Sequence, residues 1–160
     1  MILYHGSNVE VKCPIIKEKL RALDFGAGFY LTSSKQQAER WAKTVTKRRR
    51  LGIATLNVYD LDEKQLDLIE VLRFENADAE WLDFVVANRK ELFWANTYDI
   101  VIGPVANDST LPVIDDYMDG IYTKEEAVKR LLPQNLTDQY AFLSNKAIEL
   151  LKFKGSEIIC

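Results

Sequence analysis

Segments with the periodicity of strands are scattered irregularly among segments with the periodicity of helices, and this order restricts the fold more than any other feature of the sequence. Residues 53–59 alternate apolar and polar side chains, as a half-buried strand does. Residues 77–92 instead carry an apolar stripe that includes Trp81, Val85 and Leu92, as an amphipathic helix does. There is neither a regular strand–helix–strand alternation nor a glycine-rich turn that opens a helix. We therefore predict a mixed antiparallel α+β fold and disfavour a doubly wound nucleotide-binding fold.

The same patterns, read with turn and capping residues, give the other expected elements. Hydroxyl residues up to Ser34 are N-cap candidates for the helix that follows them, and Thr123 with Glu126 forms a capping box. Residues 5–8 have the composition of a turn. The other expected strands are 2–4, 29–31, 98–102, 139–143 and 153–159, and the other expected helices are 35–50, 61–72, 111–118, 123–133 and 145–151.

The composition is that of an ordinary soluble protein. The 160 residues, 48% of them hydrophobic, fit one domain spanning residues 1–160, which buries about two-thirds of the surface of the unfolded chain. A net charge of -3 predicts no general attraction to nucleic acid or to anionic membranes, although a local patch is compatible with it. Two cysteines are too few for a disulfide framework, and we find no signal peptide and no apolar run of about eighteen residues. We expect a cytoplasmic protein with free thiols and no membrane partner.

Two β-prone segments, residues 3–7 and 24–32, are interrupted by glycines, which indicates that backbone there comes close to something other than a side chain. A ligand is a plausible occupant. His5 is the single histidine, and a lone histidine beside a glycine is more often structural than catalytic. We expect no metal, because His5 with scattered carboxylates lacks the clustered ligands of a catalytic site. The sequence also lacks a nucleophile elbow, a P-loop and a cysteine–histidine signature.

The pair 3–7 and 25–30, Leu-Tyr-His-Gly-Ser followed by Phe-Gly-Ala-Gly-Phe-Tyr, resembles the signature of the ADP-ribosyltransferase superfamily, in the His-Tyr-Glu branch that includes the poly(ADP-ribose) polymerases and diphtheria toxin. In the polymerases an aromatic residue follows the tyrosine by eleven positions, and here that residue is Trp41. The tail 137–153 is similar to the family's third element, with Gln139 where a glutamate is expected. The layout most resembles a group of small bacterial ADP-ribosyltransferase-like domains, and residues 61–133 match only that group. The resemblance implies a split antiparallel β-sheet core with flanking helices.

By this resemblance the chain cleaves the bond between nicotinamide and ribose in NAD, without a metal. His5 would donate a hydrogen bond to the adenosine ribose, and Gly6 would offer its backbone to the nicotinamide amide, where a side chain would block the approach. Tyr30 would stack on the nicotinamide ring and Trp41 would close its other face, although ordinary core packing is the alternative for both. The family's helix serine is missing, since Ala38 falls near its place. The other NAD-binding residues implied are Ser7, Gly28 and Thr32, with Thr32 or Ser33 as substitutes for that serine.

Gln139 is the departure from the family's pattern that has the largest consequence. A glutamine amide still bonds a ribose hydroxyl, but it has no charge to stabilise a cationic transition state and cannot act as a base. A unit charge about 4 Å away is worth roughly 4 kcal/mol, on the order of a thousandfold in rate. Asp138 is adjacent, but strand alternation should turn it to the other face. We therefore expect mono-ADP-ribosylation rather than chain elongation, with His5, Tyr30 and Gln139 as the catalytic set.

Two alternatives stay open, an NAD glycohydrolase that uses water as the acceptor and a catalytically silent NAD-binding or interaction module. The acceptor would be a protein or a nucleic acid, and the resemblance to toxin-type domains implies an antitoxin partner. Cations at residues 47–50 complement a helix C-terminus, which is the simpler interpretation of that run. The alternative is a grip on the NAD pyrophosphate or on a nucleic acid.

Overall fold

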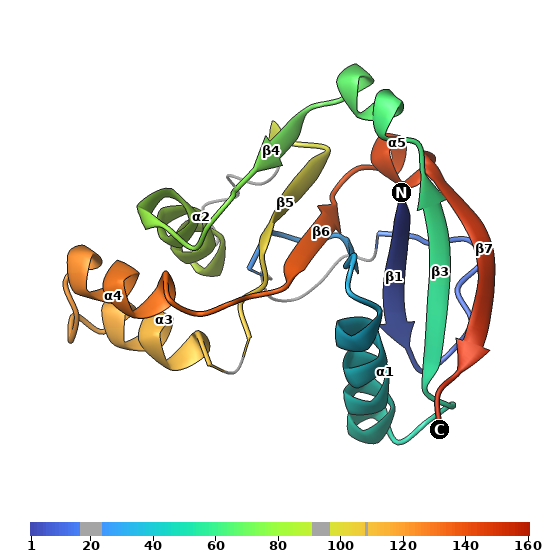
Figure 1. Ribbon diagram of the computed structural model, residues 1–160, viewed down its shortest axis with the longest axis horizontal. Helices are drawn as coiled ribbons and strands as arrows, with labels where there is room; N and C mark the ends of the chain where they lie inside the picture. Colours follow the sequence, from blue (N-terminus) through green and yellow to red (C-terminus); the bar gives the residue numbers. More distant parts are fainter. Residues whose placement is uncertain (17–23, 91–96, 108) are drawn as a thin grey trace.

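The computed structural model describes residues 1–16, 24–90, 97–107 and 109–160, which form two sheets and several helices (Figure 1). The first sheet has the order β1-β3-β7, and the second has the order β2-β6-β5-β4. All neighbouring strands are antiparallel except β4 and β5, which are parallel. The α+β class is therefore confirmed, with one parallel pair that was not expected. The strands are β1 (Ile2–Ser7), β2 (Phe29–Leu31), β3 (Thr55–Leu61), β4 (Val71–Arg73), β5 (Ile100–Pro104), β6 (Asp138–Phe142) and β7 (Leu151–Ile158).

The two faces of the second sheet are buried in different apolar clusters. One face packs against the first sheet, where residues such as Phe29 and Phe142 meet Leu3 and Tyr59. The other face carries Val101 and is covered by helices α2 (Ala79–Arg89), α3 (Leu111–Met118) and α4 (Lys124–Leu131). Figure 1 shows these three helices on the far side of the second sheet from β1, β3 and β7. Strand alternation therefore assigns each side chain of the second sheet to one cluster or the other.

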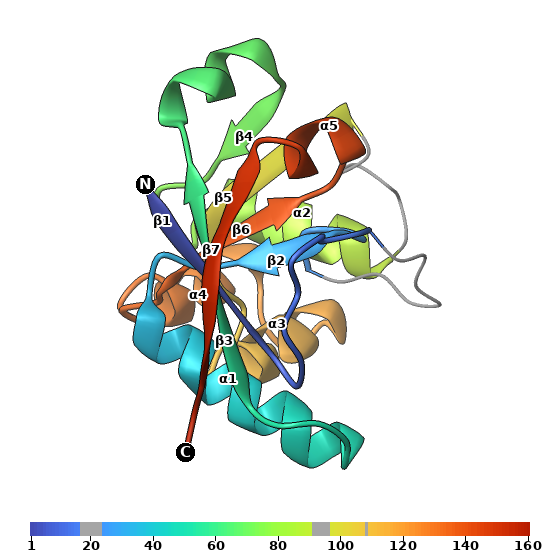
Figure 2. The same cartoon turned by 90° about the vertical axis from the view of Figure 1, so that its right-hand side faces the viewer.

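Helix α1 (Lys35–Arg49) packs its buried face, Ala38, Ala42 and Val45, against the first sheet. The Ser34 hydroxyl accepts from the N–H of Gln37, as a helix N-cap does. The expected helix over 35–50 is thus confirmed almost to the residue. Figure 1 shows α1 standing beside the lower half of β1, and Figure 2 shows it in the lower half of the molecule as well.

Two expected elements are wrong. Residues 61–72 are not an α-helix, because a 3-10 helix η1 (Glu63–Leu68) is followed there by β4, which pairs with β5. A three-residue strand of this kind depends on a distant partner and leaves little trace in local sequence. Residues 5–7 are not a turn, because they continue β1 and pair with β3. The last helix, α5 (Asn145–Ile148), is shorter than expected.

The remaining expected strands and helices are present, with ends that differ by a few residues. Leu92, at the end of the expected helix over 77–92, lies outside the described residues. None of the helices in the described part of the chain is both long and apolar enough to cross a membrane. Cys13 and Cys160 are free thiols, and both are exposed.

Candidate functional site: the fork between the two sheets

The two sheets meet where β1 approaches β2. The N–H of Tyr4 donates to the carbonyl of Thr32 at 2.8 Å, and the N–H of Thr32 donates to the carbonyl of Tyr4 at 2.9 Å. Among the described residues these are the only backbone hydrogen bonds between the two strands. Beyond this bridge the strands separate, with Gly6 on one side and Tyr30 on the other. We call this place the fork.

Strand alternation determines which backbone groups face the fork. Tyr4 and Thr32 exchange both hydrogen bonds, so the N–H and C=O of each point toward the other strand. In a strand, the N–H and C=O of every second residue point the same way. The backbone groups of Gly6, two residues after Tyr4, and of Tyr30, two residues before Thr32, therefore also point into the fork. In an uninterrupted ladder Gly6 and Tyr30 would bond to each other. The fork therefore presents backbone donors and acceptors on both of its sides.

The His5 imidazole forms a hydrogen bond with one of these backbone groups. Its Nδ1 lies 2.6 Å from the carbonyl oxygen of Tyr30, and its ring packs on Phe29 with centroids 4.2 Å apart. Because a carbonyl oxygen only accepts, Nδ1 must be the protonated nitrogen. In the neutral ring, Nε2 then carries the lone pair. The ring nitrogen left to meet a ligand is therefore Nε2, which donates a hydrogen bond in the imidazolium and accepts one in the neutral ring.

Tyr30 and Gln139 share one face of the second sheet. Tyr30 is paired with Ala141, and Gln139 stands two residues along β6 from Ala141, so the two side chains are diagonal neighbours. His5 is on the opposite face, with Phe29. Tyr30 thus stands at the fork on one face of the sheet and His5 on the other, and Gln139 lies beside Tyr30 on the neighbouring strand β6. The Gln139 amide is half-buried and makes no hydrogen bond to a described residue.

The Tyr30 phenol is held against residues 24–28, which precede β2 and which we call the glycine turn. Its hydroxyl donates to the carbonyl of Gly26, a buried glycine with a φ of 99° that only glycine adopts readily. Burial raises the pKa of the Tyr30 phenol above its ordinary value, and the Asp24 carboxylate raises it further. The phenol is therefore protonated at neutral pH. A ligand at this position would therefore meet the ring of a neutral phenol and not the charge of a phenolate.

Asp138 is committed to the chain segment that leads into α1. Its carboxylate accepts from the hydroxyl of Thr32 at 3.0 Å, and from the N–H at 2.8 Å and the hydroxyl of Ser33. The Thr32 hydroxyl also accepts from the N–H of Ser34. These hydrogen bonds hold the Asp138 carboxylate against the start of that segment. The Thr32 hydroxyl thus donates to Asp138 and accepts from the N–H of Ser34 within the protein.

Both glycines of the expected site have a structural reason to be glycine. A Cβ at Gly6 would lie 2.1 Å from the Ala38 carbonyl oxygen of α1, and one at Gly28 would lie 2.6 Å from the Phe142 carbonyl oxygen. A side chain at Gly6 would thus collide with α1, which is a reason for glycine at this position that does not involve a ligand. Ser7 is buried at the end of β1, where it pairs with Thr55.

Trp41 lies on the exposed side of α1. Its side chain is 46% exposed, so ordinary core packing does not account for it. The Arg48 guanidinium lies 5.6 Å from the centre of the Trp41 ring, a cation–π arrangement. The ring is accessible to a ligand, and it is on the helix that packs against Gly6.

A family model described as protein of unknown function (DUF3990) matches residues 1–153. The chain belongs to this family. No curated protein and no solved structure matches this member of the family. The match spans β1, the fork and β6, so the residues described above lie within the part of the chain that defines the family.

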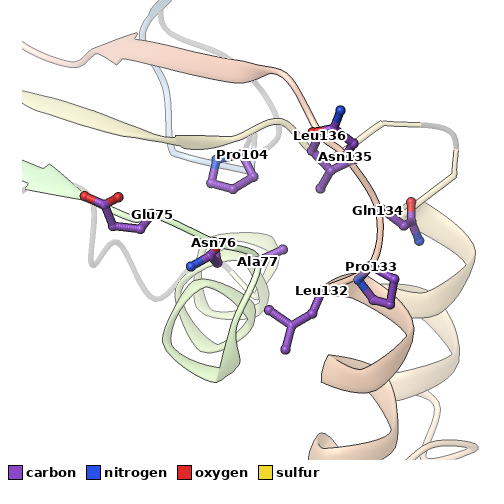
Figure 3. A pocket seen from close by; sticks show the side chains of 9 residues that line it. All are labelled: Glu75, Asn76, Ala77, Pro104, Leu132, Pro133, Gln134, Asn135 and Leu136. Atoms are coloured by element: carbon purple, nitrogen blue, oxygen red, sulfur yellow. The ribbon is translucent and has the colours of Figure 1, made fainter.

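A separate pocket of about 270 Å³ lies at the far end of the second sheet (Figure 3). It is bounded by the turn 75–77 on one side and by the chain that leaves α4, residues 132–136, on the other. Pro104, at the end of β5, forms its floor. None of the residues expected from the sequence to bind NAD lines it. Among the described residues, no group of three metal-ligating side chains is placed to hold an ion.

Sequence reasoning did not find the interactions that hold the glycine turn in place. Arg89 of α2 bonds the Asp24 carboxylate at 2.8 Å and the Asp115 carboxylate of α3 at 3.0 Å. The Asn88 amide donates to the backbone carbonyl of Asp24. Asn88 and Arg89 follow the apolar stripe of their helix, and no local signal in the sequence connects them to residue 24.

Proposed function

We propose that this protein is an NAD-dependent mono-ADP-ribosyltransferase that binds the nicotinamide end of NAD at the fork. The observation that carries the proposal is the interrupted ladder, in which no described residue of β2 bonds the N–H or C=O of Gly6 beyond the Tyr4–Thr32 bridge. A carboxamide has one donor and one acceptor side by side, as a strand residue does. Nicotinamide therefore suits an edge whose partner strand has turned away.

The half-buried ring of Tyr30 and the accessible ring of Trp41 support the same proposal. Flat aromatic faces stabilise a planar cationic ring by stacking and by cation–π attraction. His5 hydrogen-bonds the adenosine ribose, and Gln139 bonds a hydroxyl of the other ribose. The three side chains of the expected catalytic set thus have compatible tasks around one dinucleotide.

In the proposed reaction the bond between ribose C1′ and the nicotinamide nitrogen breaks, and its electron pair leaves with nicotinamide. A lone pair of the acceptor forms the new bond to C1′, and the acceptor's proton passes to solvent. The transition state resembles an oxocarbenium ion, which a nearby negative charge would stabilise. Gln139 carries no charge, and the Asp138 carboxylate is held by Thr32 and Ser33. The charge then comes from the acceptor or from another carboxylate, and the missing glutamate favours one transfer per acceptor over chain elongation.

The absence of a charge at Gln139 also supports a second candidate, a catalytically silent NAD-binding module. Incubation of the protein with labelled NAD and cell lysate separates the possibilities. A transferase leaves label on protein or on nucleic acid. A glycohydrolase releases only nicotinamide and free ADP-ribose. A silent module binds NAD and leaves it intact, and absence of both binding and turnover contradicts the proposal.

The substitution Gln139→Glu tests the charge argument. If the missing charge limits the reaction, nicotinamide release from NAD should rise by about tenfold or more, within the roughly thousandfold that a full unit charge is worth. Gln36→Glu makes the same change in charge on an exposed position of α1 and should leave turnover unchanged. If Gln139→Glu binds NAD as the wild type does but shows no rise, the charge argument is wrong.

A further inference from the structure

The solvent side of α1 carries a single stripe of cations. Residues 35–50 hold seven lysines and arginines and one carboxylate, a net charge of +6, so the rest of the chain carries -9 against a total of -3. Arg40, Lys43 and Lys47 are three or four residues apart, which aligns them along one side of the helix, and Arg50 follows them at the C-cap. All four are exposed, and they lie away from the face that α1 buries against the first sheet. The stripe is about 15 Å long at 1.5 Å per residue.

The stripe is not neutralised by the protein. Glu39 is the single carboxylate of the helix, and it pairs with Lys35. Among the described residues, no ion pair involves any of the four cations of the stripe, and Arg40 donates only to the neutral amide of Gln37. One or two cations in the last turn are enough to complement the helix dipole, and the stripe extends well beyond that turn.

We infer that this stripe is a docking surface for the phosphate backbone of a nucleic acid. Interfaces with nucleic acids are polar and strongly positive, whereas the centre of a protein–protein interface is depleted of charged side chains. The stripe is wholly charged, and its two arginines offer the planar fork that bonds phosphate oxygens in pairs. The inference concerns binding alone, so it does not depend on the proposed transferase activity.

The direct test is the fluorescence anisotropy of a labelled single-stranded 20-mer titrated with the protein at several salt concentrations, without NAD. Three or four phosphate contacts predict a slope of log K against log salt of about -2 to -3, and a duplex of the same sequence would give about -3 to -4. The triple variant Lys43→Gln, Lys47→Gln and Arg50→Gln should bind about tenfold or more weakly, with a slope smaller by about 2. Trp41 and Arg48 are left intact, because Trp41 belongs to the proposed NAD site.

The matched control is Lys129→Gln, Lys152→Gln and Lys154→Gln, which removes three exposed lysines from α4 and β7 and so gives the same net charge. It should bind like the wild type. Equal losses in both triple variants, or no binding of either nucleic acid at low salt, would overturn the inference. Displacement of the oligonucleotide by polyglutamate at equal charge concentration would also overturn it, because the surface would then suit an acidic protein segment. If the stripe variant unfolds, Lys47→Gln alone should still lower the slope by about 0.7.

Discussion

At the scale of single residues, the fork depends on side chains that bond to backbone. Nδ1 of His5 donates a hydrogen bond to the carbonyl oxygen of Tyr30, and the Tyr30 phenol donates one to the carbonyl oxygen of Gly26. Each side chain satisfies a main-chain group that no strand partner reaches, which is what buried backbone requires. Changes at these residues should therefore affect both the stability of the fork and its ability to bind a ligand.

Tyr30 makes a specific contribution to the pH dependence of stability. Burial raises the pKa of its phenol, so the folded state keeps the proton at a pH where the unfolded chain, with a pKa near 10, has lost it. Unfolding then releases a proton, so the free energy of unfolding is unaffected below about pH 10 and falls above it, by at most about 1.4 kcal/mol per pH unit for one tyrosine. Burial raises the pKa of Tyr59 and Tyr140 in the same direction.

Urea unfolding between pH 8 and pH 11 measures this effect. Tyr30→Phe should lose about 1 kcal/mol at pH 8, because its hydrogen bond to Gly26 is gone, and should show a shallower loss of stability above pH 10. Tyr122→Phe removes a phenol that makes no hydrogen bond to a described residue, and it serves as the control. An equally steep alkaline loss in Tyr30→Phe and in the wild type would show that Tyr30 ionises as freely in the folded protein as in the unfolded chain.

At the scale of elements, the contact between β1 and α1 sets the shape of one side of the fork. A Cβ at Gly6 would meet both the Ala38 carbonyl oxygen and, at 2.7 Å, the Ala42 nitrogen. Both atoms belong to helix backbone, so neither can rotate away. Gly6→Ala must therefore move α1 as a whole.

We expect Gly6→Ala to lower the free energy of unfolding by about 3 kcal/mol, the upper part of the range for overpacking. Gly120→Ala is the comparison, since a Cβ there meets nothing within 4 Å and only the backbone strain at a φ of 80° remains. Its cost should be about 1–2 kcal/mol. Thermal or urea unfolding of both variants decides the question, and equal losses would mean that α1 does not pack on β1 as described.

The elements that the sequence predicts well are those with local signals. The Ser34 cap and the good helix formers after it predict α1, and Thr123 predicts the start of α4. β4 escapes prediction because its three residues become a strand only by pairing with β5. The length of β1 escapes it because His5, Gly6 and Ser7 have a turn-like composition and are extended only through β3.

At the scale of the whole molecule, the two sheets are each formed by their own strands and are joined by the Tyr4–Thr32 bridge. The strand order places β2 beside β6 and β1 beside β3, so residues near position 5, position 30 and position 139 meet only when both sheets have formed. Sequence motifs selected these positions through family resemblance. They did not indicate that His5 approaches from one face while Tyr30 and Gln139 share the other, because that depends on strand register.

The anchoring of the site is also a property of the whole molecule. Asp138 ties the end of β6 to the segment before α1, and Arg89 ties the glycine turn to α2 and α3. Both connections join residues more than sixty positions apart. Contacts of this kind are set by tertiary structure, and no periodicity or capping pattern encodes them.

A structure of the protein with NAD bound is the most direct measurement of the central claim. We expect the nicotinamide carboxamide to lie within about 3 Å of both the N–H and the C=O of Gly6, with the ring against Tyr30 and a ribose hydroxyl near Gln139. NAD seated instead in the pocket bounded by residues 75–77 and 132–136, or a fork that stays empty when NAD is present at millimolar concentration, would contradict it.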